Sequence, residues 1–287
     1  MLLPRIAYAR PGSVDEAVAM LTEHDNARAL AGGQTLVNVM KLRFAAPDVV
    51  VDLRGIPGLA DVAVGDDGSV ELGAMATYDA IERAARVSAV RPILGRVASV
   101  IADEQVRNRG TIGGNLCSND PTNHFPPLMV ALGATMTIVG STGEREVSAE
   151  EFFAGVYLTA VEPGELLTRV RVPPPETGEG GGFASMTIGK EGTGIVNVAA
   201  RVRVNGAIAE PRVAIGCVAA VPVRASAMEE ALAGAPPTEA SVRLAARGLG
   251  STLDPPSDVH ASADYRRHLA EVIAVRATLG AIEEALR

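Results

Sequence analysis

The sequence predicts an α+β protein with more than one domain. Short apolar strands and helical segments alternate near the N-terminus, a strand, turn and strand follow from residue 61, and an Ala-rich helical tail begins near residue 226. The chain has 287 residues, whereas a single core usually serves roughly 100 to 200. We therefore expect two or three small domains.

The composition is that of an ordinary globular chain and excludes several classes of protein. Hydrophobic residues make up 47% and charged residues 21% of the sequence, and no apolar run approaches the ~20 residues of a membrane span. The N-terminal residues lack the pattern of a secretory signal, so we expect a cytoplasmic location. A net charge of -8 and 3% aromatic residues disfavour nucleic-acid binding, which needs a basic surface or stacking rings.

Cysteine and histidine are too scarce for a metal cluster. The chain contains two cysteines, Cys117 and Cys217, and four scattered histidines. A tetrahedral metal site or an iron–sulfur cluster usually takes four such ligands close together. We expect the chain to hold no metal of its own.

The first 57 residues are expected to form a small α/β unit. Ser13 precedes a segment with helical spacing and Glu16 follows three positions later, which is typical of a capped helix. RALAGG predicts a short buried strand that runs into a glycine turn, TLVNVMKLR a helix, and VVVDL a second, parallel strand. GIPGL is the expected linker to the next part.

Residues 58–175 are expected to form a second, α+β part. DVAV, GDDG and SVELGA predict a strand, a tight turn and a strand, because Asp and Gly adopt the turn's unusual backbone angles. Helices are predicted around YDAIERAAR and RPILGRVASVI. PPLMVAL predicts a further short helix and ATMTIVG a strand.

A Pro- and Gly-rich segment, VRVPPPETGEGGGF, marks the boundary before a third part at residues 180–287. We interpret its EGGGF as a flexible linker. IVNVAARVRV and PRVAIGCVA then predict antiparallel strands joined at Asn205-Gly206, and helices follow to the end.

Two glycine motifs are the candidates for a phosphate-binding site. In Ala31–Thr35 a predicted strand ends in paired glycines and a helix follows, so free backbone amides and the positive end of the helix point at the space above the turn. Thr111–Asn115 repeats this arrangement 80 residues later. Each pair alone is more simply a tight turn. Together they predict two walls of one diphosphate site.

Other nucleotide sites lack their motifs in this chain. Neither glycine pair fits the G-x-G-x-x-G pattern of a Rossmann dinucleotide site with an acidic residue about 20 positions later. No G-x-x-x-x-G-K-[ST] loop occurs, so the chain lacks the minimal phosphate loop of nucleotide hydrolases.

AGGQTLVNVMKLR and VRNRGTIGGNLCSNDP resemble the two FAD-diphosphate motifs of the medium subunit in the carbon monoxide dehydrogenase and xanthine dehydrogenase family of molybdenum hydroxylases. The resemblance extends into PPLMVALGA, GELLTRVRVP and DPPSDVHASADYRRHLA, so it covers nearly the whole chain. It implies a two-part FAD-binding domain of the PCMH type, shared with vanillyl-alcohol oxidase. A C-terminal medium-subunit domain with a small antiparallel sheet and helices would follow.

The resemblance also implies an electron-transfer function. Such a subunit works beside a small chain with two [2Fe-2S] clusters and a large chain with a molybdopterin cofactor, expected as a dimer of heterotrimers. Electrons pass from molybdenum through the clusters to FAD and then to an external acceptor. Neither the acceptor nor the substrate of the complex follows from this sequence.

The resemblance assigns cofactor contacts residue by residue and no catalytic residue. Twelve positions are implied to bind FAD: Ala31, Gly32, Gly33, Gln34, Thr35, Leu36, Thr111, Gly113, Gly114, Asn115, His124 and Lys190.

Some of these positions depart from the family pattern. His124 stands where many relatives have an Asp, and a cap of the following helix is an equal interpretation. Lys190 precedes Glu191-Gly192-Thr193 rather than the usual Gly-Asp and aromatic residue. If Thr193 replaces a stacking ring, Thr193→Tyr will change the flavin midpoint potential, and identical potentials would remove this hypothesis.

Three further residues near the second motif have open roles. Arg107 and Arg109 are equally well interpreted as phosphate or partner contacts and as solvated surface residues. Cys117 is expected to be a small buried residue without a catalytic role.

Two other functions remain open at this point. A self-contained flavin oxidase would need a larger substrate domain than this length provides. A flavin-free scaffold that bridges partners would not need the two intact glycine motifs, although the changes at His124, Gly192 and Thr193 keep it possible.

Overall fold

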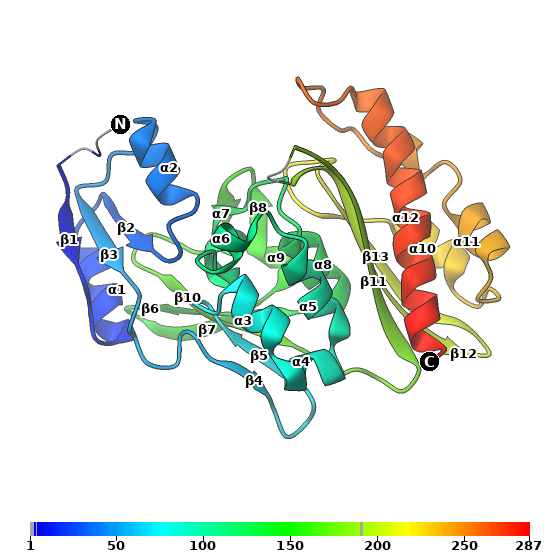
Figure 1. The fold of residues 1–287 in the computed structure, drawn as a ribbon, viewed down its shortest axis with the longest axis horizontal. Helices are drawn as coiled ribbons and strands as arrows, with labels where there is room; N and C mark the ends of the chain where they lie inside the picture. Colours follow the sequence, from blue (N-terminus) through cyan, green and yellow to red (C-terminus); the bar gives the residue numbers. More distant parts are fainter. Residues whose placement is uncertain (1–2, 4, 190–191) are drawn as a thin grey trace.

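Of the four sheets in the described part of the chain, the three larger ones lie one after another along the molecule (Figure 1). The computed structural model describes residues 3, 5–189 and 192–287. An N-terminal unit, a central unit and a C-terminal unit follow from left to right in the figure, and each contains helices packed on a sheet. The expected α+β class is confirmed. The chain boundaries expected near residues 57 and 175–180 stay predictions.

The N-terminal unit is a three-stranded parallel sheet in the order β1-β3-β2. Its elements are β1 (Ala7–Ala9), α1 (Val14–Glu23), β2 (Ala27–Leu30), α2 (Leu36–Lys41) and β3 (Val49–Asp52). The central strand β3 is wholly buried, and it is the parallel strand expected from VVVDL. Ser13 caps α1 as expected, since its Oγ accepts from the Glu16 amide at 3.1 Å.

One expectation for this unit, the burial of the RALAGG strand, was wrong. β2 is an edge strand in which Arg28 and Ala29 are exposed, because only one of its sides has a neighbouring strand. The segment GIPGL connects this unit to the next one, as expected, and two of its residues are packed rather than exposed. Ile56 and Leu59 are buried in the apolar core under α1, so the connection is fixed by packing.

The central unit is a five-stranded antiparallel sheet in the order β4-β5-β10-β6-β7. Its strands are β4 (Val62–Val64), β5 (Val70–Gly73), β6 (Thr135–Gly140), β7 (Gly143–Ser148) and β10 (Leu166–Val172), and the short pair β8 (Phe153–Gly155) and β9 (Leu158–Thr159) lies beside it. The expected hairpin β4–β5 is confirmed.

Helices in this unit pack against the sheet around the largest buried core (Figure 1). They are α3 (Tyr78–Arg83), α4 (Ala85–Val90), α5 (Pro92–Ser99), α6 (Glu104–Arg107), α7 (Ile112–Ser118), α8 (Phe125–Leu132) and α9 (Ala149–Phe152). Every residue of α8 is buried, which places this helix between the central sheet and the C-terminal unit.

The C-terminal unit is a four-stranded antiparallel sheet in the order β11-β12-β13-β14 with helices on it. Its elements are β11 (Glu179–Ile188), β12 (Thr193–Asn205), β13 (Ala207–Gly216), β14 (Val223–Arg224), α10 (Ser226–Leu232), α11 (Glu239–Ala245), a 3-10 turn (Leu249–Thr252) and α12 (Ala263–Ala285). The expected antiparallel strands and helical tail are confirmed.

The interpretation of EGGGF as a flexible linker was wrong, because these residues open strand β11. A Cβ on Gly180 would lie 2.2 Å from the Ala281 carbonyl oxygen, and one on Gly182 would lie 1.9 Å from that of Ala277. Both of these acceptors belong to α12. The glycines therefore let a helix backbone lie directly on the strand.

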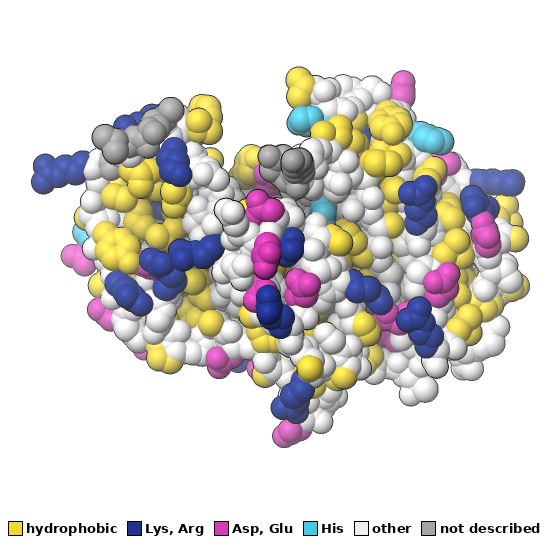
Figure 2. Space-filling view, viewed as in Figure 1, with side chains coloured by type: hydrophobic (Ala, Val, Ile, Leu, Met, Phe, Trp, Pro, Cys, Tyr) yellow, Lys and Arg dark blue, Asp and Glu magenta, His cyan; other side chains and the backbone are white. Residues whose placement is uncertain are grey.

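Charged side chains of both signs are interspersed over the face shown in Figure 2. Among the helices in the described part of the chain, none is long and apolar enough to cross a bilayer. The cytoplasmic location stays a prediction.

Candidate functional site

The two glycine motifs meet in space although 80 residues separate them in the sequence. A Cβ on Gly32 would lie 2.1 Å from the Arg109 carbonyl oxygen and 2.9 Å from Gly110 Cα. A Cβ on Gly114 would lie 3.6 Å from the Ala31 side chain. Contact this close is open only to glycine, so the first motif packs directly against the chain that enters the second.

The first motif leaves its backbone amides free. Gly33 has a φ of 73°, which turns the chain between β2 and α2. The Gln34 side chain donates to the Gly32 carbonyl at 3.2 Å, and Asn38 Nδ2 donates to the Gln34 carbonyl at 2.7 Å. Within residues 5–189 and 192–287, the amides of residues 32–35 donate no backbone hydrogen bond. These amides are therefore available to an anion.

The second motif is held rigidly by β5 and by its own cap. Thr111 Oγ1 accepts from the Gly114 amide at 3.1 Å and so caps α7. The amides of Ile112 and Gly113 donate to carbonyls of the turn after β5 at 2.9 and 2.8 Å. A Cβ on Gly113 would lie 2.6 Å from the Ala74 carbonyl oxygen, so this position also requires glycine.

Asn115 supplies a buried polar group beside this wall. Its side chain is 8% exposed, and its Oδ1 has no hydrogen-bond partner among the described residues. Tyr78 is buried near this wall, and burial raises the pKa of its hydroxyl. Buried polar atoms in proteins are nearly always paired, so this unpaired acceptor fits a ligand group that donates a hydrogen bond, such as a hydroxyl, rather than a phosphate oxygen. Sequence reasoning missed Tyr78, because nothing around it marks a site.

Arg107 and Arg109, which precede the second motif, differ in whether their side chains already have partners. Arg107 donates to the Ile101 and Ala102 carbonyls at 3.2 and 3.1 Å and lies 3.8 Å from Glu82, so it is used locally. Arg109 is exposed, and its side chain makes no ion pair among the described residues. Of the two, Arg109 is the cation that an anionic ligand can reach.

His124 lies in a different environment from the glycine walls. It is 4% exposed, and its ring lies 5.3 Å from the ring of Phe183 and within 3.2 Å of Asn197 Nδ2. It occupies the N-cap position of α8, as the capping interpretation expected, but its side chain makes no capping hydrogen bond. Burial lowers the pKa of His124 to about 4.

Only some of the residues from Lys190 to Thr193, which the resemblance places near the flavin ring, are among the described residues. Lys190 lies outside the described residues. Gly192 has a φ of 68°, and a Cβ there would lie 3.8 Å from the Val100 carbonyl and from the Ala102 amide. Thr193 begins β12 directly beside this contact. The hypothesis about Thr193 and the flavin potential stays a prediction.

Cys117 packs against the central core and is tied to no charged partner. Burial raises the pKa of its thiol to about 12, which keeps it protonated and unreactive. Within the part of the chain that the structure describes, no group of three or more His, Cys, Asp or Glu side chains is arranged to hold a metal ion.

The glycine site fits the diphosphate of a dinucleotide. A diphosphate carries oxygens that accept many hydrogen bonds; the first motif offers free amides, and the segment that enters the second motif offers the exposed Arg109. The donors come from two units that meet at one line of glycines, as an extended ligand held between them requires.

The two parts of the chain match two protein families. Residues 4–175 match the FAD binding domain in molybdopterin dehydrogenase, and residues 183–281 match the CO dehydrogenase flavoprotein C-terminal domain. The chain is 37% identical to the carbon monoxide dehydrogenase medium chain of Afipia carboxidovorans over 94% of each chain. It is 32% identical to the nicotine 6-hydroxylase medium subunit of Paenarthrobacter nicotinovorans over 97% of this chain and 98% of that one.

Solved structures agree over the whole length. The carbon monoxide dehydrogenase of Hydrogenophaga pseudoflava contains a chain that superposes with a TM-score of 0.95 and 35% identity, covering 99% of both chains. Quinoline 2-oxidoreductase from Pseudomonas putida 86 contains one with a TM-score of 0.94 and 34% identity, covering 100% of both. Motifs, fold and relatives coincide, and the chain belongs to the family of FAD-binding medium subunits of the molybdenum hydroxylases.

Proposed function

We propose that the chain holds one FAD noncovalently between its two glycine motifs and passes electrons from a partner's [2Fe-2S] clusters to an external acceptor. The observation that carries the proposal is the contact of Gly32 with the Arg109–Gly110 turn. This contact brings together two segments that lie about 80 residues apart in the sequence, which supports a site shared by both motifs.

Each wall has a distinct task in this proposal. The free amides of the first motif and the start of α2 would bind the diphosphate, and the capped end of α7 would line the opposite side of the site. The residues assigned to these walls are Ala31, Gly32, Gly33, Gln34, Thr35, Leu36, Thr111, Gly113, Gly114 and Asn115. His124 and Lys190 stay predictions, because the first is buried in contact with Phe183 and Asn197 and the second lies outside the described residues.

FAD supplies the redox chemistry when bound, and the protein supplies binding, orientation and potential. Two cysteines cannot ligate two clusters that need four thiolates each, so the metal centres belong to other chains. We propose a small iron–sulfur subunit and a large molybdopterin subunit as partners, in a dimer of heterotrimers. Relatives named medium chain or medium subunit support this division.

We further propose that residues 1–57 and 58–175 are the two parts of the FAD-binding domain and that residues 180–287 form the C-terminal medium-subunit domain. The three separate sheets and the family boundaries at 175 and 183 support these limits.

An ultraviolet-visible spectrum of the purified full chain, followed by heat release and identification of the flavin, tests the proposal. We expect a flavin spectrum and FAD in the supernatant. A colourless chain that also fails to take up added FAD would contradict the proposal and favour a scaffold that bridges partners. Flavin that stays with the precipitated protein would contradict noncovalent binding.

A further inference from the structure

We propose that Asn197, a residue of the C-terminal unit, is a positioning residue for the second glycine motif and thereby sets the affinity for FAD. This inference rests on the proposed FAD site. Asn197 does not belong to that site itself, since it lies within β12 and acts through a hydrogen-bonded loop.

Asn197 is fully buried and reaches across to the central unit. Its Nδ2 donates to the Asn123 carbonyl at 3.0 Å and lies 3.2 Å from His124 Nδ1 and 3.3 Å from Cys217 Sγ. The orientation of this amide is determined by chemistry, because a backbone carbonyl can only accept and must face a donor. The contact therefore depends on the NH2 group of an Asn.

The loop held by Asn197 in turn holds the second motif. Asn123 Nδ2 donates to the Asn115 carbonyl at 2.9 Å and lies 3.2 Å from Ser118 Oγ. Ser118 Oγ donates to the same Asn115 carbonyl at 2.9 Å. Two hydrogen bonds in series thus join the middle of β12 to Asn115, the residue with the unpaired Oδ1 in the glycine wall.

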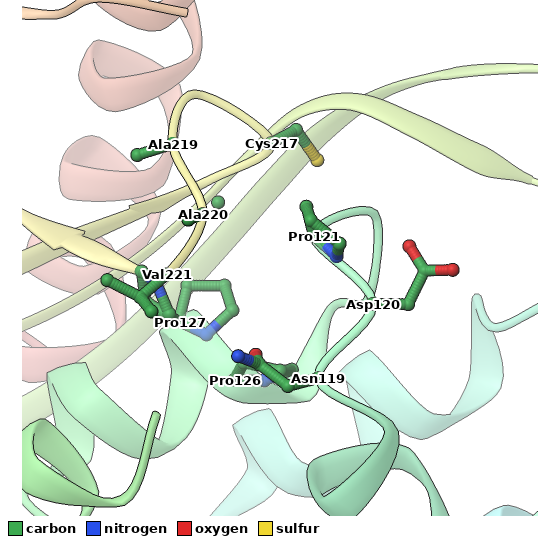
Figure 3. Close-up of a pocket in the computed structure, with 11 residues that line it drawn as sticks. Asn119, Asp120, Pro121, Pro126, Pro127, Cys217, Ala219, Ala220 and Val221 are labelled. Atoms are coloured by element: carbon green, nitrogen blue, oxygen red, sulfur yellow. The ribbon is translucent and has the colours of Figure 1, made fainter. Parts of the chain in front are cut away.

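Two glycines in the C-terminal sheet leave room for this contact, since a side chain at either position would collide with it. A Cβ on Gly194 would lie 2.9 Å from the Thr122 carbonyl oxygen, and one on Gly216 would lie 2.2 Å from Asn197 Oδ1. Figure 3 shows the loop at Asn119–Pro121 facing the chain near Cys217. Residues of both segments line a narrow cavity of about 10 Å³, which has room for about one water. The loop is fitted closely enough that losing one donor changes its position.

The Oδ1 of Asn197 has no hydrogen-bond partner among the described residues. An apolar side chain of similar size would avoid this unpaired buried atom, so the residue does not serve the stability of the C-terminal unit alone. Its NH2 group instead orders the loop before the ligand arrives. A ligand that must order its own site binds more weakly.

The test is the FAD dissociation constant of the full chain, measured by flavin fluorescence, together with the 31P NMR spectrum of the bound diphosphate. Asn197→Asp keeps the shape but places an oxygen against the Asn123 carbonyl. We expect about tenfold weaker binding and shifted 31P resonances, within the usual range of coupling between sites.

Arg212→Met is the matched control. Arg212 Nη2 donates to the Val130 carbonyl at 3.0 Å and also pairs with Glu150. The variant therefore weakens a contact between the same two units, but at a place that does not include the second motif. We expect a lowered melting temperature with a dissociation constant within about twofold of wild type and unchanged 31P resonances.

Unchanged FAD binding in Asn197→Asp, or equal weakening in Arg212→Met, overturns the inference, because the effect is then absent or only a loss of stability. If Asn197→Asp does not fold, Asn197→Ser is measured in the same way and has the same two outcomes. In the double variant with Asn123→Ala, additive effects would show that the coupling does not run through Asn123. A wild-type chain that binds no FAD instead overturns the proposed function.

Discussion

The glycines of the first 115 residues and those at the start of β11 look alike in the sequence but have opposite tasks in the structure. Gly32 brings two backbones together beside amides that stay free for a ligand, and Gly113 packs α7 against the turn after β5. Gly180 and Gly182 bring a strand and α12 together and leave nothing free between them.

This difference shows that a glycine cluster indicates only close approach of a backbone. The role of a glycine cluster depends on the segment that packs against it. Free backbone amides beside the contact can bind an anion, whereas a helix packed over the glycines forms part of the core. The three predictions that follow test whether stability and FAD affinity divide between these regions.

Gly182→Ala is expected to have the largest effect, on stability. Its Cβ would lie 1.9 Å from the Ala277 carbonyl oxygen, so α12 must move from the sheet, at a cost of about 3 kcal/mol in the free energy of unfolding. Urea unfolding of the FAD-free chain measures this. Gly280→Ala is the control, since its Cβ would meet Gly182 Cα at an ordinary 3.8 Å. Equal stability of Gly182→Ala and wild type would show that the glycine contact is not required.

Gly32→Ala is expected to act mainly on FAD affinity. Its Cβ would lie 2.1 Å from the Arg109 carbonyl oxygen and would separate the two walls. Losing one charge-assisted hydrogen bond of about 1.5–3 kcal/mol corresponds to roughly 10- to 100-fold weaker binding. A fluorescence titration with FAD checks this, with Gly12→Ala as a control in the same unit. Full affinity in Gly32→Ala would contradict the two-wall site.

Because His124 is buried, we expect the free energy of unfolding to depend on pH. Burial lowers the folded-state pKa to about 4, whereas the unfolded value is about 6.5. The unfolded chain therefore binds more protons between these values, and stability falls as the pH falls through this window. Between pH 7 and 5 we expect a loss of about 2 kcal/mol that is absent in His124→Gln.

The control for this effect is His268→Gln, because His268 is exposed. Urea unfolding at both pH values gives the comparison. If wild type and His124→Gln lose the same stability between pH 7 and 5, His124 is not held neutral by burial.

Local features of the fold could be predicted from the sequence. Ser13 with Glu16, the Asp and Gly residues between β4 and β5, and Asn205-Gly206 each determine a structure within a few residues. The position of β10 between β5 and β6, and the edge position of β2, depend on segments far along the chain. The spacing of apolar residues along the sequence does not indicate which distant strand will lie beside a given strand.

The candidate site divides in the same way. Its glycine motifs could be recognised, because paired glycines between a strand and a helix have a local meaning. Tyr78, the buried setting of His124 and the reach of Asn197 could not, since each depends on a partner that only tertiary structure supplies.

The packing of α12 on the glycine face of β11 has a consequence for synthesis of the chain. Ala277 is made 95 residues after Gly182, and at roughly 5–20 residues per second this delay is about 5–20 s. Both glycine motifs of the candidate flavin site have left the peptidyl-transferase centre long before then. During that interval the β11 face stays uncovered on a nascent chain. A chaperone that binds apolar, uncovered strands would find its target there.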